Sequence, residues 1–176
     1  MDGNSGFVEG LTKILVKMKA ISEKDMESLI HDFKVSPKAR FDYFLLEEGI
    51  VKKDDLLPAL GEYYQIPYFD LEGYFFNRDL LILFPKDLLE RKAFIPIELD
   101  GSIMTVAVSD PELEGLREDI GEYTTHVIEF RVGLRRDIIS SIRDYYDKNA
   151  RELEEEESEK EGGNVPNDDD SVDFIS

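Results

Sequence analysis

The sequence contains no cysteine and only two histidines among its 176 residues, and this narrows the chemistry open to it. Without cysteine the chain has no disulfide, no thiolate nucleophile and no cysteine metal site, which suits a reducing compartment. His31 and His126 lack the spacing of a paired metal ligand, so we expect both to be solvated or capping residues. The sequence therefore predicts no metal site.

The motifs of nucleotide-binding and nucleophilic enzymes are missing as well. There is no Gly-x-x-x-x-Gly-Lys-Ser/Thr loop to hold phosphates, no Gly-x-Gly-x-x-Gly fingerprint and no Gly-x-Ser-x-Gly elbow. Adjacent carboxylates occur at positions 47–48 and 54–55, but such pairs are usually solvated when no cleft holds them. We therefore expect no catalytic residue, no cofactor and no ATP hydrolysis by this chain alone.

Long apolar runs and a balanced charge are also absent. Apolar runs such as Leu80–Phe84 are too short to span a bilayer, and Met1–Gly6 lacks the basic and apolar parts of a secretion signal. The net charge is −19, and residues 151–176 alone hold 11 acidic and 2 basic side chains. This charge repels nucleic acid and anionic lipid. We therefore expect a cytoplasmic protein with no nucleic-acid ligand, no direct membrane insertion and a basic or apolar partner surface.

An internal repeat occupies the first third of the chain. Residues 10–33 and 40–63 align at an offset of thirty, and their apolar positions coincide. The matching positions include Leu11/Phe41, Leu15/Leu45, Ile21/Val51 and Leu29/Ala59. A shared burial pattern without a shared surface indicates a duplicated packing unit. Each copy is predicted to be a helix, a turn and a second helix, and we expect the two copies to pack on each other.

The residues after the repeat alternate between strand and helix patterns. We expect a strand at 68–71, helices at 78–84 and 85–92, strands at 93–99 and 103–108 joined by a turn at Asp100-Gly101, a helix at 111–123, a strand at 127–132 and a helix at 135–146. From Arg151 onward, acidic runs with glycine and proline predict disorder. The last apolar stretch, Val172–Ile175, is interpreted as the stub of a linker, with a short docking peptide as the alternative.

These patterns together predict an α+β protein. An N-terminal duplicated helical subdomain at 7–65 packs on a small α/β sandwich with a mixed sheet at 66–149, followed by a disordered acidic tail or linker at 150–176.

The order of these segments resembles the N-terminal domain of type II secretion and type IV pilus assembly ATPases, the GspE/PilB/MshE family. The resemblance covers about Phe7–Tyr146 and combines the helical duplication with four short segments. These are Gln65–Leu71, Leu83–Pro85, Phe94–Ile97 followed by Asp100-Gly101, and Val106–Pro111. The resemblance implies a non-catalytic module ahead of a motor. It also implies a protein partner, either the cytoplasmic domain of an inner-membrane platform protein or the ATPase motor, and recruitment to the inner face of the inner membrane.

The same resemblance implies a candidate ligand site. MshE-type members bind cyclic di-GMP through a duplicated motif with Arg-Leu-Gly near its start, a glycine at the turn and Leu-x-x-x-Leu-x-x-Gln beyond. The second copy here retains Arg40, Gly49, Leu56 and Leu60 and has Phe41 in place of leucine. An arginine can pair with phosphate or a guanine edge, and a glycine lets backbone approach a ligand closely.

The motif is eroded, so an alternative interpretation stands beside the ligand site. In the second copy Asp42 and Tyr63 replace glycine and glutamine; the first copy keeps Leu11 but carries other residues at four motif positions, namely Gly10, Thr12, Lys19 and Phe33. Arg40 is then a helix-start residue paired with Asp42 or Glu47, and Gly49 is a helix C-cap.

The leading hypothesis is an adaptor or regulatory domain of a secretion or pilus ATPase system that docks to the membrane platform. One alternative is a cyclic di-GMP receptor module that uses Arg40, Phe41, Gly49, Leu56 and Leu60. Another is a stand-alone paralogue that acts as a protein-interaction module through its acidic tail.

Overall fold

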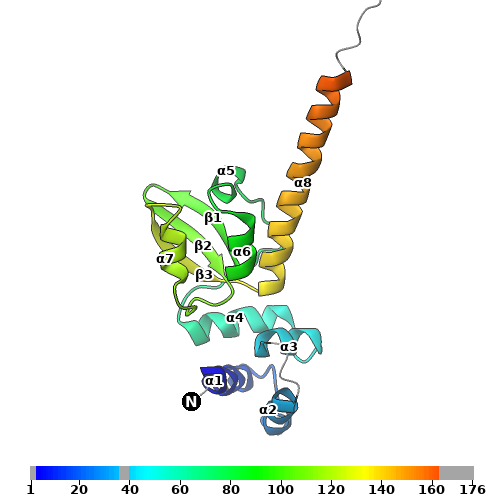
Figure 1. The fold of residues 1–176 in the computed structure, drawn as a ribbon. Coiled ribbons are helices and arrows are strands. Elements are labelled where there is room, and N and C mark those ends of the chain that lie inside the picture. Colours follow the sequence, from blue (N-terminus) through cyan, green and yellow to red (C-terminus); the bar gives the residue numbers. More distant parts are fainter. Residues whose placement is uncertain (1–2, 36–39, 163–176) are drawn as a thin grey trace, which may run out of the picture. The chain divides into compact units, whose positions relative to one another are not determined.

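The computed structural model describes residues 3–35 and 40–162. The chain divides into two compact units, Met1–Ile142 and Arg143–Ser176. The helices are α1 (Gly3–Lys17), α2 (Met26–Val35), α3 (Phe41–Glu47), α4 (Lys53–Tyr64), α5 (Arg78–Leu81), α6 (Lys86–Lys92), α7 (Leu116–Gly121) and α8 (Arg135–Gly162). The strands are β1 (Phe94–Asp100), β2 (Ile103–Val108) and β3 (Val127–Val132). In the first unit, α1 to α4 gather at one end and the sheet lies at the other (Figure 1).

The predicted helical duplication is confirmed, because the turns that join its helices repeat at the offset of thirty. Lys19 and Gly49 both adopt left-handed backbone, with φ of 63° and 65°. The amide after each donates to the carbonyl of the equivalent leucine, Ala20 to Leu15 at 2.9 Å and Ile50 to Leu45 at 3.0 Å. This is the Schellman-type end of a helix, in which the left-handed residue satisfies otherwise unpaired carbonyls.

The two copies share one hydrophobic core, as their common apolar pattern predicted. α1 packs on α4, the side chains of Leu11, Leu15 and Phe41 are fully buried, and the Phe33 and Phe41 rings meet edge to face at 5.0 Å. The core extends into the sheet half through Val132 and Leu134. Neither copy could exclude water from this surface alone, so the repeat is stable only as a pair.

The sheet is mixed, as predicted. Its strand order is β1-β2-β3, with β1 and β2 antiparallel across the Asp100-Gly101 turn and β2 and β3 parallel. The register shifts between Pro96 and Glu98, a bulge that proline imposes because it has no amide to donate. Alternate side chains of β2, Met104, Val106 and Val108, are fully buried and fix one face of the sheet against the core.

Three predicted elements are shorter than expected, and turn chemistry explains two of them. The strand expected at 68–71 is a single parallel bridge between Tyr68 and Val132, because the Asp70 side chain accepts the Glu72 amide at 3.0 Å and turns the chain. The helix expected at 111–123 begins only at Leu116, after Gly115 in left-handed backbone. The helix expected at 78–84 is α5, which ends at Leu81.

The last helix is longer than expected. α8 continues from Arg135 to Gly162, whereas the prediction ended it at Tyr146 and assigned disorder from residue 150. Residues 150–162 are helical and exposed, because glutamate, lysine and arginine favour helix even where no apolar face is buried. The remainder of the predicted tail, with Val172–Ile175, lies outside the described residues. Among residues 3–35 and 40–162 no helix is both long and apolar enough to span a membrane.

Candidate functional site

Arg40 lies where the helical repeat meets the sheet half. It precedes α3 in extended backbone, and its guanidinium reaches across to the loop after β2. Nε donates to Asp42 Oδ1 at 3.1 Å, Nη2 donates to the Ser109 carbonyl at 3.3 Å, and Nη1 lies 3.6 Å from Asp110 Oδ2. The fork geometry of arginine allows these contacts at once. Arg40 therefore ties the second repeat to the sheet half.

The surroundings of Arg40 favour its charged form. Burial alone would lower the pKa of Arg40, but the neighbouring carboxylates, with Asp42 the strongest, raise it above its ordinary value. Burial also raises the pKa of Tyr64, whose hydroxyl oxygen accepts from Arg40 Nη2 at 3.5 Å, so this hydroxyl remains protonated. The guanidinium also lies 5.6 Å from the centre of the Phe7 ring, a cation–π contact.

The remaining residues of the predicted ligand motif do not gather around Arg40 at the surface. Phe41, Leu56 and Leu60 are fully buried in the core of the repeat. Gly49 is exposed, and a Cβ placed there would touch nothing within 4 Å. The interpretation of Gly49 as a helix C-cap therefore agrees with its geometry, and three of the five residues serve packing.

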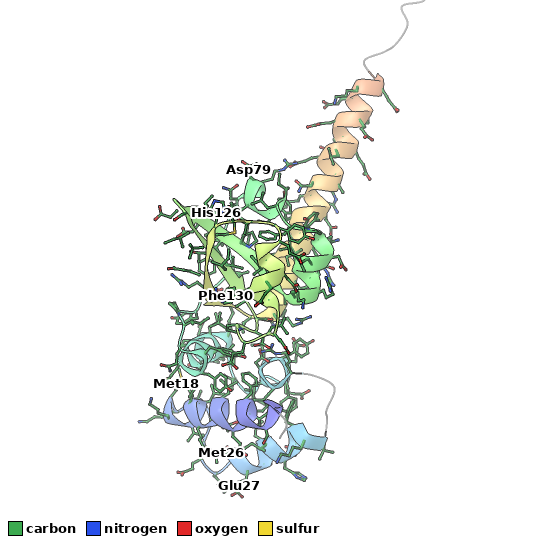
Figure 2. All side chains as sticks on the ribbon, turned by 60° about the vertical axis from the view of Figure 1, so that its left-hand side comes forward. Met18, Met26, Glu27, Asp79, His126 and Phe130 are labelled. Atoms are coloured by element: carbon green, nitrogen blue, oxygen red, sulfur yellow. The ribbon has the colours of Figure 1, made fainter. Side chains whose placement is uncertain are left out.

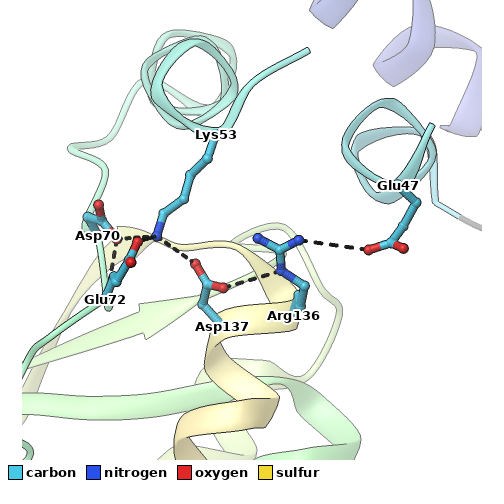
Figure 3. A network of polar contacts seen from close by, with 6 residues as sticks. All are labelled: Glu47, Lys53, Asp70, Glu72, Arg136 and Asp137. Carbon is cyan, nitrogen blue, oxygen red and sulfur yellow. Dashed lines mark hydrogen bonds and ion pairs between the residues drawn. The ribbon is translucent and has the colours of Figure 1, made fainter. Parts of the chain in front are cut away.

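A second cation, Lys53 at the start of α4, also connects the helical repeat with the sheet half (Figure 3). Its Nζ lies 2.7 Å from Asp70 Oδ1, 2.8 Å from Glu72 Oε2 and 3.2 Å from Asp137 Oδ2. The Lys53 side chain is only 16% exposed. Burial lowers the pKa of Lys53, but the hydrogen bonds to the three carboxylates raise it above its ordinary value, so the lysine is charged.

The Lys53 cluster continues to α3 through Arg136. Arg136 lies 3.5 Å from Asp137 Oδ1 and 3.8 Å from Glu47 Oε1 (Figure 3). Glu47 thus pairs with α8 and not with Arg40, whereas the expected pairing of Arg40 with Asp42 is observed. No spacing in the sequence signals this cluster, because its members come from α3, α4, the 70–72 segment and α8.

The chemistry at this junction is electrostatic. Within residues 3–35 and 40–162, no group of His, Asp and Glu side chains is arranged to hold a metal ion. His126 directly precedes β3, and its Nδ1 lies 2.6 Å from Thr124 Oγ1. Figure 2 places His126 in the sheet half, far from Met18 in the helical half. The junction is suited to fixing the two halves against each other.

Comparison with known proteins identifies the family. The sequence pattern of the MshEN domain matches residues 64–152, half of the chain. The chain belongs to the MshEN domain family. The chain is 24% identical over 145 residues to the type IV pilus assembly ATPase PilB of Myxococcus xanthus (strain DK1622). The matched region is 82% of this chain but 25% of PilB, so the chain spans about a quarter of that relative's length.

Two solved structures share the fold of this MshEN domain. The structure of MshE with cdg (cyclic di-GMP) has a TM-score of 0.63 and 23% identity, covering 77% of this chain and 98% of that chain. The N-terminal domain of XpsE has a TM-score of 0.56 and 15% identity, covering 81% and 96%. The resemblance to N-terminal domains of secretion and pilus ATPases is thereby confirmed. The matched family pattern begins at residue 64 and leaves the motif with Arg40 and Gly49 outside it.

Proposed function

We propose that this MshEN domain is a non-catalytic adaptor of a type II secretion or type IV pilus assembly ATPase system and docks to the cytoplasmic domain of an inner-membrane platform protein. The observation that carries the proposal is the match of 82% of this chain to a quarter of a pilus assembly ATPase. The protein then acts in the cytoplasm at the inner face of the inner membrane.

The junction supports an adaptor role on physical grounds. An adaptor between a motor and a membrane benefits from holding its two attachment surfaces in a fixed relative orientation. If the surfaces were mobile, they would have to become ordered on binding, and this ordering would lower the affinity. Arg40 connects the helical repeat with the sheet half through Asp110 and the Ser109 carbonyl. Lys53 makes the same connection through Asp70, Glu72 and Asp137. Several partners around one cation define an orientation better than a single exposed ion pair does.

A binding measurement with purified proteins tests the proposal. The full chain is titrated against the cytoplasmic domain of the platform protein of the same system by isothermal titration calorimetry. We expect saturable binding at micromolar or tighter affinity, about −8 kcal/mol. Circular dichroism of the same samples establishes that the chain is folded. A folded chain that gives no heat at tens of micromolar contradicts the docking role.

A second candidate function is cyclic di-GMP binding, which the shared fold with the structure of MshE with cdg favours. Arg40 and Gly49 would contact the ligand, and Phe41, Leu56 and Leu60 would form the apolar frame behind them. To bind a phosphate, Arg40 would have to exchange at least one of its carboxylate partners, Asp42 or Asp110, for the ligand. The buried Asp42 carboxylate also repels an anion placed beside it.

Calorimetry with cyclic di-GMP decides on this second candidate. Binding that Arg40→Ala abolishes and Lys17→Ala leaves unchanged would support it, because Lys17 is a basic side chain of α1 that pairs with a carboxylate at the surface. If the unaltered chain gives no heat at tens of micromolar dinucleotide, the candidate is rejected, and the adaptor role is unaffected.

A further inference from the structure

Phe75 is almost completely exposed, although it lies between two packed aromatic residues. Its side chain is 95% accessible, the highest value among the large hydrophobic residues that the structure describes. Single exposed apolar residues are common, but a phenylalanine presents about 150–250 Å² of apolar surface when nothing covers it. The position therefore calls for a physical reason.

The segment that carries Phe75 is held on both sides. Before it, the Tyr74 hydroxyl donates to the Ile97 carbonyl at 3.0 Å, and the Tyr74 ring meets Phe69 and Phe76 edge to face at 5.0 and 4.9 Å. After it, the Asn77 side chain caps α5 by accepting the Asp79 amide at 2.9 Å. The backbone on both sides of Phe75 is thus held in place, and Phe75 is presented to solvent between these two fixed points.

Further apolar side chains follow at the other end of α5. Ile82 and Leu83 are 60% and 40% exposed. Because α5 is a single turn of four residues, about 6 Å long, Phe75 and this pair flank one short element. We call Phe75, Ile82 and Leu83 the α5 patch.

We propose that Phe75 anchors the docking surface of this domain and inserts into an apolar pocket of a protein partner, with Ile82 and Leu83 packing at its side. The inference rests on the proposed function, and the partner is the cytoplasmic domain of the inner-membrane platform protein. Aromatic side chains that fill a partner's pocket contribute much of the affinity in many interfaces, and a phenylalanine has only two side-chain dihedral angles to immobilise on binding.

The net charge of the chain favours a protein over an anionic membrane as the partner. Around the α5 patch, exposed charges of both signs occur, with Glu72 and Asp79 accompanied by Arg78 and Lys86. The chain as a whole carries a net charge of −19, and this charge disfavours insertion of Phe75 into an anionic lipid surface.

The experiment compares Phe75→Ser with Val35→Ser in the platform titration. Val35 lies at the end of α2 in the helical half and is 71% exposed, so its replacement removes an exposed apolar side chain away from the α5 patch. We expect Phe75→Ser to weaken binding by at least about tenfold, and Val35→Ser to change it by less than about twofold. Phe75→Leu, which keeps an apolar side chain, should retain part of the affinity. Thermal unfolding should be unchanged in all three variants, because Phe75 contacts little in the free protein.

The outcomes separate the anchor from the proposed function. If the unaltered chain does not bind the platform domain, the docking role and the Phe75 anchor are both overturned. If it binds and Phe75→Ser binds equally well, the anchor alone is overturned. Sedimentation with vesicles of phosphatidylcholine and phosphatidylglycerol completes the test, because vesicle binding that Phe75→Ser abolishes would replace the protein partner with lipid and refute the inference.

Discussion

Lys53→Met provides a direct test of the junction between the two halves. Methionine keeps the apolar stem of the lysine and removes only its charge, so three carboxylates lose their common cation. Asp70 and Glu72 are 47% and 79% exposed, and their pairs with Lys53 contribute about 0.5 kcal/mol each, as solvated ion pairs do. Asp137 is only 18% exposed, and its pair contributes about 1–2 kcal/mol, between the values of surface and buried pairs.

The free energy of unfolding should therefore fall by about 2–3 kcal/mol at pH 7, and the melting temperature by about 5–10 °C. Urea unfolding followed by circular dichroism measures the first quantity, and a thermal scan measures the second. Lys17→Met is the matched control. Lys17 Nζ lies 2.7 Å from Glu62 Oε1, as close as Lys53 lies to Asp70, but its side chain is 73% exposed.

The burial of the lysine, and not the length of its ion pair, should decide how much stability each substitution removes. Lys17→Met should cost less than about 0.5 kcal/mol, because solvent screens its ion pair. The deficit of Lys53→Met should also shrink as the pH falls below about 4, because Lys53 holds the pKa of Asp70 below its ordinary value and the wild-type carboxylate loses its charge in that range. Equal losses for the two variants, or a Lys53→Met deficit that does not change with pH, would refute the reasoning.

Four further substitutions test single positions. Lys19→Gly should stabilise the protein by about 0.5–1 kcal/mol and Gly49→Ala should destabilise it by about 1 kcal/mol, both measured by urea unfolding, because both positions have left-handed backbone. Gly10→Ala should lower the melting temperature, since an added Cβ would lie 2.7 Å from the Tyr63 ring. Burial raises the pKa of Asp70 but the hydrogen bond from Lys53 lowers it further, so its net pKa is depressed. Asp70→Asn should therefore cost stability at pH 7, and the cost should vanish at pH values below the folded-state pKa, where the wild-type carboxyl is protonated as well.

The sequence was sufficient to predict those elements that follow from a repeated apolar pattern or from a short turn motif. The thirty-residue offset predicted the duplicated helices because burial repeats with it, and Asp100-Gly101 predicted the hairpin because only a few residues adopt that turn. The prediction was wrong where a side chain or a glycine redirects the backbone. Asp70 turns the chain after the Tyr68 bridge, and Gly115 delays α7. The intrinsic preference of residues for strand is small, so a turn that is stabilised by a side chain or a glycine can override it.

The candidate site was predictable only in part. Arg40 and Asp42 are two residues apart, so their pairing could be inferred from the sequence, and the structure shows it. The Lys53 cluster could not be inferred, because Asp70, Glu72 and Asp137 are 17 to 84 positions away and the chain holds 40 acidic residues as alternative partners. Tertiary packing alone selects three of them.

The free edge of β3 bears on how this domain binds a partner. Val127 and Gly133 donate to the Ser102 and Val108 carbonyls, so the odd-numbered residues of β3 face β2 and the even-numbered ones face outward. The outward carbonyls are occupied: Arg117 Nη1 donates to Ile128 at 3.0 Å and Arg131 Nη1 donates to Phe130 at 3.1 Å.

The last outward residue of β3, Val132, accepts the Phe69 amide at 2.8 Å and donates its own amide to Pro67. A partner strand that donated to the outward carbonyls of β3 would have to displace two arginines and the 67–69 segment. Edge protection of this kind disfavours strand addition. Docking beside β3 is therefore expected to rely on side chains, and among the large hydrophobic residues described in the sheet half Phe75 has the largest exposed fraction.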